Sequence, residues 1–202
     1  MSFPSGSKRA KQILELVHSD VFGPVSVPSL GKFIYYASFR DDFSKNTGIY
    51  FLRNKYEVFD RFKEFKALME NQTKKKIKVL RTDNGGEFCK KKFEEFCKKC
   101  GIARQKTTPY KPKKNGVVER MNKILMERAR SMLSGVGLGQ EFWVEAVDTA
   151  CYLVNRSSSL ELEDKTPHEV WIGKKSSLSH MRLFGCSAYV HVPKDKRTKI
   201  RK

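Results

Sequence analysis

The hydrophobic pattern changes its period along the chain, and this change restricts what the sequence can fold into. Apolar residues alternate or run together over 14–22, 33–39 and 47–52, as they do in β-strands. The short polar link 41–46 suggests that the second and third strands form an antiparallel hairpin. From 56 to 72 apolar residues recur at helical spacing instead. They are Phe59, Phe62, Phe65 and Met69. The first third of the chain therefore predicts a sheet followed by a long amphipathic helix.

The rest of the chain alternates between the two kinds of element. Short apolar runs predict strands over 77–82 and 102–106, with a helix over 89–100 between them that stops at Gly101. Further helices are expected from residue 116, over 141–155 and from Thr166-Pro167, with breaks at Gly135, Gly137 and Gly139 and a last strand over 187–192. This order predicts an α/β domain with a mixed five-stranded sheet flanked by helices and a C-terminal helical and strand extension.

Composition excludes several classes of protein. With 202 residues, 39% of them hydrophobic, the chain is long and apolar enough to bury a core, so it is not a disordered protein. Its longest apolar stretches, 33–39 and 150–154, are far shorter than the ~18 residues of a membrane span. The N-terminus lacks the apolar region of a secretory signal. We expect a soluble intracellular domain without a membrane partner.

The charge is large and uneven. The formal net charge is +19, and residues 73–114 hold 15 Lys and Arg against 4 Asp and Glu. A single lysine run is typically a solvated surface, but an excess of this size repels itself unless a polyanion neutralises it. Nucleic acid is favoured as the partner over an anionic membrane, because no basic amphipathic stretch has a continuous apolar face.

The cysteines indicate neither disulfides nor a metal site. Their number is odd, and the C-x-x-C pair Cys97 and Cys100 has no second pair at a spacing that suits zinc. The four histidines are scattered and do not supply one. We interpret all five cysteines as reduced packing residues.

Three carboxylates lie where elements are expected to converge. Asp20 is near the end of the first strand, Asp83 ends the 77–82 strand before a Gly-Gly turn, and Glu119 falls in the first turn of the helix from 116. Strand ends and helix N-termini commonly meet at one edge of an open sheet. Clustered carboxylates suit hard divalent ions such as Mg²⁺ or Mn²⁺, and two such ions roughly 4 Å apart catalyse phosphoryl transfer. Because any chain with 22 acidic residues yields many triples, spacing alone leaves this site open.

Three runs in the same order carry a family resemblance: LELVHSDVFGP at 14–24, RTDNGGEF at 81–88 and TPYKPKKNGVVERMN at 108–122. They resemble the integrase core of Copia-type LTR retrotransposons, which are related to retroviral integrases. The 35 residues between Asp83 and Glu119 match the D,D(35)E pattern of that family. Later stretches are similar too, so the resemblance runs from about residue 3 to 193. They lie at 142–146, 152–156, 165–167 and 180–186.

The resemblance implies an RNase H-like fold and a metal-dependent polynucleotidyl transferase. Asp20 would bridge two Mg²⁺ or Mn²⁺ ions, while Asp83 and Glu119 would each hold one. The implied reaction is strand transfer, in which the 3′-hydroxyl of the element's DNA attacks a target phosphodiester without a covalent protein intermediate. Double-stranded DNA is the implied partner, and assembly on DNA implies a homo-oligomer. Asp41 and Asp42 look like an acidic pair of the family that is not part of its triad.

Contacts with DNA are predicted in the loop before the catalytic helix and within that helix. The predicted residues are Tyr110, Lys111, Lys113, Lys114, Asn115 and Lys123. Lys123 either binds a phosphate or pairs with Glu119 four residues earlier. Asn84 and Asn115 either support the metal ligands or supply a turn and a helix cap, and for Asn115 the cap is favoured. Tyr110 stacks on a base or anchors its loop.

The domain division follows from the same resemblance. Residues 1–11 read as a linker remnant behind a missing zinc module, 12–160 as the catalytic core and 161–202 as an extension with a basic tail. The leading hypothesis is an integrase core that catalyses DNA integration. The alternative is a truncated, non-catalytic retrotransposon relic that only binds nucleic acid, and a ribonuclease H is a third. The substrate implies a nuclear location, with a cytoplasmic particle before import as the other stage.

Overall fold

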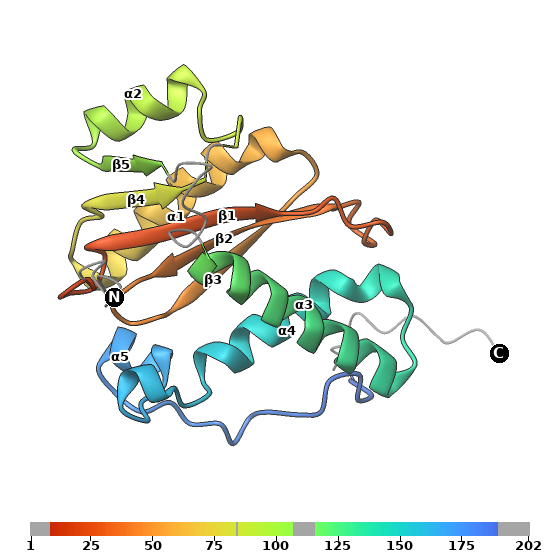
Figure 1. Ribbon diagram of the computed structural model, residues 1–202. Helices are drawn as coiled ribbons and strands as arrows, with labels where there is room; N and C mark the ends of the chain where they lie inside the picture. The colour runs from red at the N-terminus through yellow and green to blue at the C-terminus, as the bar shows by residue number, and fades with distance from the viewer. Residues whose placement is uncertain (1–8, 84, 107–115, 190–202) are drawn as a thin grey trace, which may run out of the picture.

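The computed structural model describes residues 9–83, 85–106 and 116–189. Its centre is a five-stranded sheet in the order β3-β2-β1-β4-β5 (Figure 1). The strands are β1 (Leu16–Phe22), β2 (Tyr35–Asp41), β3 (Thr47–Leu52), β4 (Val79–Thr82) and β5 (Ala103–Lys106). The first three pair antiparallel, whereas β1 with β4 and β4 with β5 pair parallel. The predicted mixed sheet and its hairpin are therefore confirmed.

Helices cover both faces of the sheet (Figure 1). They are α1 (Val58–Thr73), α2 (Lys91–Lys99), α3 (Gly116–Val136), α4 (Trp143–Asn155) and α5 (Pro167–Ile172), with short 3₁₀ turns at Lys55–Glu57, Gln140–Phe142 and Leu160–Leu162. Helices α1 and α2 pack on one face with β1 and β2 residues such as Val17 and Phe39. Helices α3 and α4 pack on the other face around Tyr36 and Trp143. The molecule is thus a three-layer α/β/α structure.

The alternation within β1 decides which face each residue meets. Val17 is buried in the cluster beneath α1 and α2, and because successive strand residues point to opposite faces, His18 and Asp20 point towards α3. Phe22, two residues beyond Asp20, packs in the cluster beneath α3 and α4. Asp20 therefore lies between the central strand of the sheet and the helix that carries Glu119.

One boundary prediction was wrong, and the described part of the last predicted strand is not formed. Helix α3 continues through Gly135 to Val136, and the chain leaves it at Gly137, whose φ of 67° suits glycine. The strand predicted over 187–192 is not formed by 187–189, which have no regular structure, while 190–192 lie outside the described residues. Neither edge strand of the sheet pairs with 187–189, and Tyr189 is 96% exposed, so these three residues lack the partner that a strand needs.

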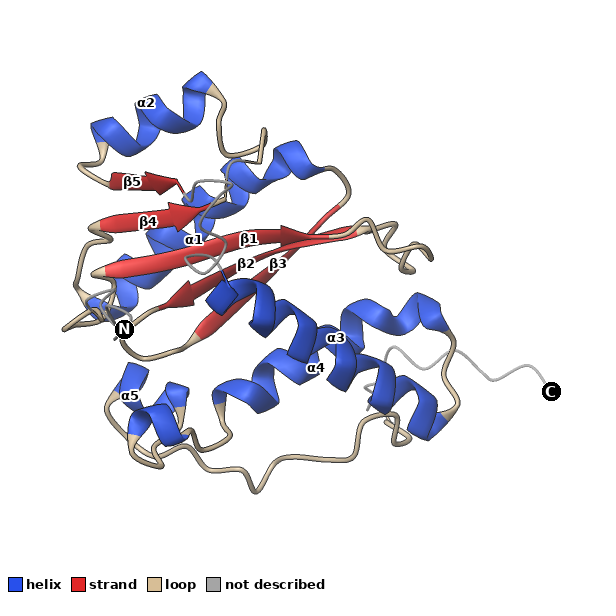
Figure 2. Cartoon of the chain, in the orientation of Figure 1, coloured by secondary structure: helices blue, strands red, loops and turns tan. Residues whose placement is uncertain are grey.

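The C-terminal segment packs against the core as a short helix and a long loop (Figure 2). Helix α5 begins at the capping box of Thr166 and Glu169, and its Trp171 is buried in the same cluster as Phe39. Further on, His180 Nε2 lies 2.6 Å from Tyr152 Oη of α4. Along the described ranges, no helix is long and apolar enough to cross a membrane.

Candidate active site

Asp20 and Asp83 lie at matching positions on adjacent parallel strands. The β1–β4 register pairs Val17 with Leu80 and His18 with Arg81. Extending it by two residues on each strand brings Asp20 opposite Asp83, because parallel strands advance together. Asp83 follows the last residue of β4, and its Oδ1 accepts a hydrogen bond of 3.0 Å from the Gly85 amide. Strand geometry therefore brings two carboxylates to one edge of the sheet.

The carboxylates perturb one another. Burial and the nearby charge of Asp83 raise the pKa of Asp20 to about 6, and Glu119 adds a smaller effect in the same direction. Hydrogen bonds from the Val21 amide and the Asn122 side chain oppose the rise in pKa. The charges of the other two predicted ligands thus act on Asp20 at this edge.

Glu119 comes from the first turn of α3, as predicted, and its side chain is exposed. Within the described part of the chain, no three His, Cys, Asp or Glu side chains stand close enough to bind one ion together. The structure therefore brings Asp20 and Asp83 together and leaves Glu119 on the adjacent helix.

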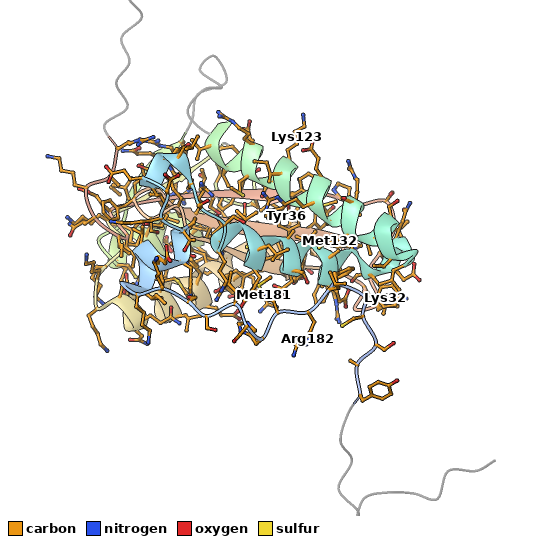
Figure 3. All side chains as sticks on the ribbon, turned by 90° about the horizontal axis from the view of Figure 1, so that it is seen from below. Lys32, Tyr36, Lys123, Met132, Met181 and Arg182 are labelled. Atoms are coloured by element: carbon orange, nitrogen blue, oxygen red, sulfur yellow. The ribbon has the colours of Figure 1, made fainter. Side chains whose placement is uncertain are left out.

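Asn122 was not among the residues that the sequence singled out. It is 1% exposed, and its Nδ2 donates a 2.9 Å hydrogen bond to Asp20 Oδ2. Its backbone carbonyl accepts a 3.3 Å bond from the buried hydroxyl of Tyr36, whose side chain lies beneath α3 and α4 (Figure 3). One feature of the sequence could have indicated this role. Asn122 is a polar residue on the buried side of a helix, three positions after Glu119 and next to Met121.

The donor set fits a divalent cation. Two carboxylates repel each other at Asp20 and Asp83, and Asn122 Oδ1 is a buried acceptor without a hydrogen-bond partner among the described residues. Asp20 and Asp83 thus bring carboxylate oxygens to this edge, where the charge of Asp83 disfavours ionisation of Asp20. Hard oxygen ligands of this kind select Mg²⁺ or Mn²⁺.

The residues predicted to contact DNA are only partly described. Tyr110, Lys111, Lys113, Lys114 and Asn115 lie outside the described residues, as does Asn84. Lys123 lies on the outer side of α3 and is 77% exposed (Figure 3). Its Nζ lies 4.0 Å from Glu127 Oε1. The ion pair with Glu119, which the sequence also allowed, is not among the ion pairs of the described residues.

Asp41 and Asp42 have structural roles, which agrees with leaving them out of the triad. Asp41 accepts hydrogen bonds from the Leu14 amide and from the amide and hydroxyl of Ser44. Asp42 accepts bonds from the Ala10 amide at 2.9 Å and pairs with His18 Nε2 at 3.2 Å. These contacts fix the hairpin and the N-terminal segment to the sheet.

The cysteine prediction was correct in part. No disulfide joins any of the five, and Cys97 and Cys151 are buried in the two cores. Cys89 and Cys186 are exposed, so they are not part of either core. Both lie in irregular segments of the chain.

An α/β/α core with paired carboxylates at parallel strand ends is RNase H-like, the fold of polynucleotidyl transferases. The integrase core domain family model matches residues 10–112, which is about half of the chain. The chain belongs to the integrase core domain family. Metal binding and DNA binding are typical of this family.

Relatives come from plant and yeast retrotransposons. The chain is 48% identical over 200 residues to the retrovirus-related Pol polyprotein from transposon TNT 1-94 of Nicotiana tabacum, covering 99% of this chain and 15% of that polyprotein. It is 30% identical over 187 residues to the Pol polyprotein from transposon RE2 of Arabidopsis thaliana, covering 93% and 13%. To the truncated transposon Ty1-A Gag-Pol polyprotein of Saccharomyces cerevisiae it is 28% identical over 186 residues, covering 89% and 14%. The chain thus spans a small part of these relatives.

Solved structures share the fold. The simian T-cell lymphotropic virus intasome in complex with PP2A regulatory subunit B56 gamma gives a TM-score of 0.66 at 17% identity, covering 92% of this chain and 63% of that chain. The HTLV-2 integrase catalytic core domain in complex with magnesium, in its trimeric form, gives 0.60 at 20% identity, covering 80% and 99%. The predicted RNase H-like fold is confirmed by these likenesses.

Proposed function

We propose that this chain is the catalytic core of an integrase that joins the 3′ ends of retrotransposon DNA to target DNA. The observation that carries the proposal is the alignment of Asp20 and Asp83 at adjacent parallel strand ends. Their negative charges repel each other there, and a bound cation would relieve this repulsion. Membership of the integrase core domain family supports it, as do the Pol polyprotein relatives.

In this proposal Asp20, Asp83 and Glu119 would together hold two Mg²⁺ or Mn²⁺ ions. When bound, such ions promote ionisation of the attacking hydroxyl and neutralise charge on the leaving oxygen. Asn122 holds the Asp20 carboxylate through its 2.9 Å hydrogen bond and favours the ionised form. The magnesium complex of the HTLV-2 catalytic core supports a divalent cofactor.

The proposed reaction conserves the number of phosphodiester bonds. The 3′-hydroxyl oxygen of the element's DNA forms a bond to the target phosphorus, and the bond from that phosphorus to the target 3′-oxygen breaks. The hydroxyl proton leaves to solvent, and the released oxygen takes up a proton. Lys123 is exposed four residues beyond Glu119 on α3, where its ammonium group suits a DNA phosphate.

Partners, domains and location complete the proposal. The DNA is double-stranded, and the chain acts as a homo-oligomer on it, which the intasome and the trimeric and dimeric neighbours support by analogy. Residues 1–11 would link to a preceding zinc module, 12–160 would be the catalytic core, and 161–202 would be the extension. The site of action would be the nucleus, after passage through a cytoplasmic particle.

A disintegration assay tests the proposal. A branched DNA that mimics the strand-transfer product is incubated with Mn²⁺ and the wild type, Asp83→Asn or Glu119→Gln. Asp60→Asn is the matched control, because Asp60 is an exposed acid whose nearest cation is Lys63 at 2.6 Å. We expect resolution by the wild type and Asp60→Asn, and its loss in the two site variants.

The same assay separates the alternative. A folded wild type that binds DNA and leaves the branched substrate intact contradicts catalysis and supports the non-catalytic relic. Resolution that survives both site substitutions contradicts the assignment of the carboxylates.

A further inference from the structure

We propose that the outer face of α2 binds the phosphate backbone of duplex DNA, as a contact surface separate from the carboxylates. This lysine face consists of Lys91, Lys92, Lys98 and Lys99. The inference rests on the proposed function, because that function brings a duplex to the adjacent edge of the sheet. It assigns a second surface to the same partner.

The orientation of α2 is fixed by its apolar side. Phe93 and Cys97 are fully buried, and the Phe93 ring lies 5.2 Å from Phe62 and 5.4 Å from Phe59 of α1. The four lysines stand one, six, seven or eight positions apart, which places them within one third of the circumference of a helix with 3.6 residues per turn. All four are exposed. The packing of α2 therefore presents them together to solvent.

The acids of α2 leave most of this charge uncompensated. Glu94 is engaged by Lys106 at 2.6 Å, and Glu95 lies 3.9 Å from Lys91. Within the described ranges, no carboxylate lies within 4.0 Å of the ammonium groups of Lys92, Lys98 and Lys99. Three cations on one short helix are thus available to an external anion.

Helix stability does not explain the pattern. Cations in the last turn, such as Lys98 and Lys99, are favoured by the helix dipole. Lys91 and Lys92 occupy the first turn, where the same dipole disfavours positive charge. A lysine face that extends over both ends of the helix therefore serves something outside it, and a regular array of phosphates matches its length.

The lysine face begins beside the strand ends that carry Asp20 and Asp83. Helix α2 starts eight residues after Asp83, and the connection is held by a 3.0 Å bond from the Phe88 amide to the Gly85 carbonyl. Its nine residues span about 13 Å, roughly four base pairs of duplex. Helix α2 lies at the β5 side of the sheet, away from α3 and α4 (Figure 1). A duplex that reaches Asp83 can therefore continue along α2.

Binding to a duplex at several salt concentrations tests the proposal. The triple variant Lys92→Gln/Lys98→Gln/Lys99→Gln is compared with Lys165→Gln/Lys174→Gln/Lys175→Gln, whose lysines are also exposed. Each variant lowers the formal charge by three, so general electrostatics are matched. We expect the slope of log K against log salt to fall in magnitude by about 2.7 for the α2 variant, since each phosphate contact contributes about 0.9. The control should change it by less than about 0.5.

Amine footprinting of the wild type with the same duplex tests the proposed contact without any substitution. Lys92, Lys98 and Lys99 should be protected from acylation several-fold, and Lys165, Lys174 and Lys175 should not. If the wild type binds the duplex but both triple variants behave alike, or if footprinting shows no protection on α2, the lysine face is refuted and the proposed function stands. A folded wild type that binds no duplex refutes both.

Discussion

Replacing Asn122 with alanine tests how the fold prepares Asp20. The 2.9 Å bond from Asn122 Nδ2 favours the ionised form of Asp20, whose pKa is about 6. A hydrogen bond to a charged group contributes about 1.5–3 kcal/mol, and each pKa unit corresponds to about 1.4 kcal/mol. Without the bond, the pKa of Asp20 should therefore rise by about one to two units.

The consequence is largest near neutral pH. The protonated fraction of Asp20 at pH 7 should increase from roughly a tenth to a half or more, since the pKa passes from below that pH to about or above it. A protonated carboxyl is a poor ligand, so the affinity for Mn²⁺ at pH 7 should fall in Asn122→Ala and recover at pH 9.

Carbon-detected NMR of the aspartate carboxyls in metal-free protein measures this shift, with the Asp20 signal assigned by its loss in Asp20→Asn. Asn155→Ala is the matched control. Asn155 is also buried. It accepts a 2.9 Å hydrogen bond from the Thr47 amide and donates one of 2.7 Å to the Thr47 carbonyl, away from the carboxylates. An Asp20 pKa that moves equally in both variants, or in neither, would refute the reasoning.

Two further predictions concern stability. Burial alone would raise the pKa of Asp42. Hydrogen bonds from His18 and the Ala10 amide, together with Lys45, hold that pKa well below its usual range instead. A carboxyl whose pKa is lowered in the folded state stabilises the protein at pH values above its pKa in the unfolded chain. The free energy of unfolding should therefore decline as pH falls below about 4, and it should decline less steeply in Asp42→Asn. Equal slopes against pH for the two proteins, measured by urea titration, would contradict this. Phe39 is fully buried and stacks on Phe65 at 4.7 Å, so Phe39→Ala should cost about 3–5 kcal/mol, and a loss below about 1 kcal/mol would contradict the assigned core.

Much of the sheet could be predicted because its strands are short, apolar and separated by clear turns. Residues 47–52 were predicted with the bounds that β3 has, and the change to helical spacing marked α1. The ends of elements were less accurate, because pairing partners rather than the local pattern decide where a strand begins. The strand at 187–192 shows the limit: its pattern resembles a strand, yet neither edge of the sheet pairs with 187–189.

The candidate site was predictable as a set of carboxylates and less so as an environment. The parallel register of β1 and β4 brings Asp20 and Asp83 together, as their positions at strand ends suggested. Asn122 escaped notice because its role depends on a partner that precedes it by 102 residues, and no local pattern reports such a contact. The preference of Lys123 for Glu127 over Glu119 likewise depends on how the side chains lie on α3.

The most direct measurement of the central claim is the position of Mn²⁺ in a crystal grown with that ion. We predict anomalous peaks within about 2.2 Å of carboxylate oxygens of Asp20 and Asp83, with Glu119 turned towards one of them. Asp83→Asn, crystallised in the same way, should lose or greatly weaken these peaks. Peaks at Asp41 and Asp42 instead, or strong peaks that Asp83→Asn leaves unchanged, would contradict the assignment of Asp20 and Asp83 as the metal-binding pair.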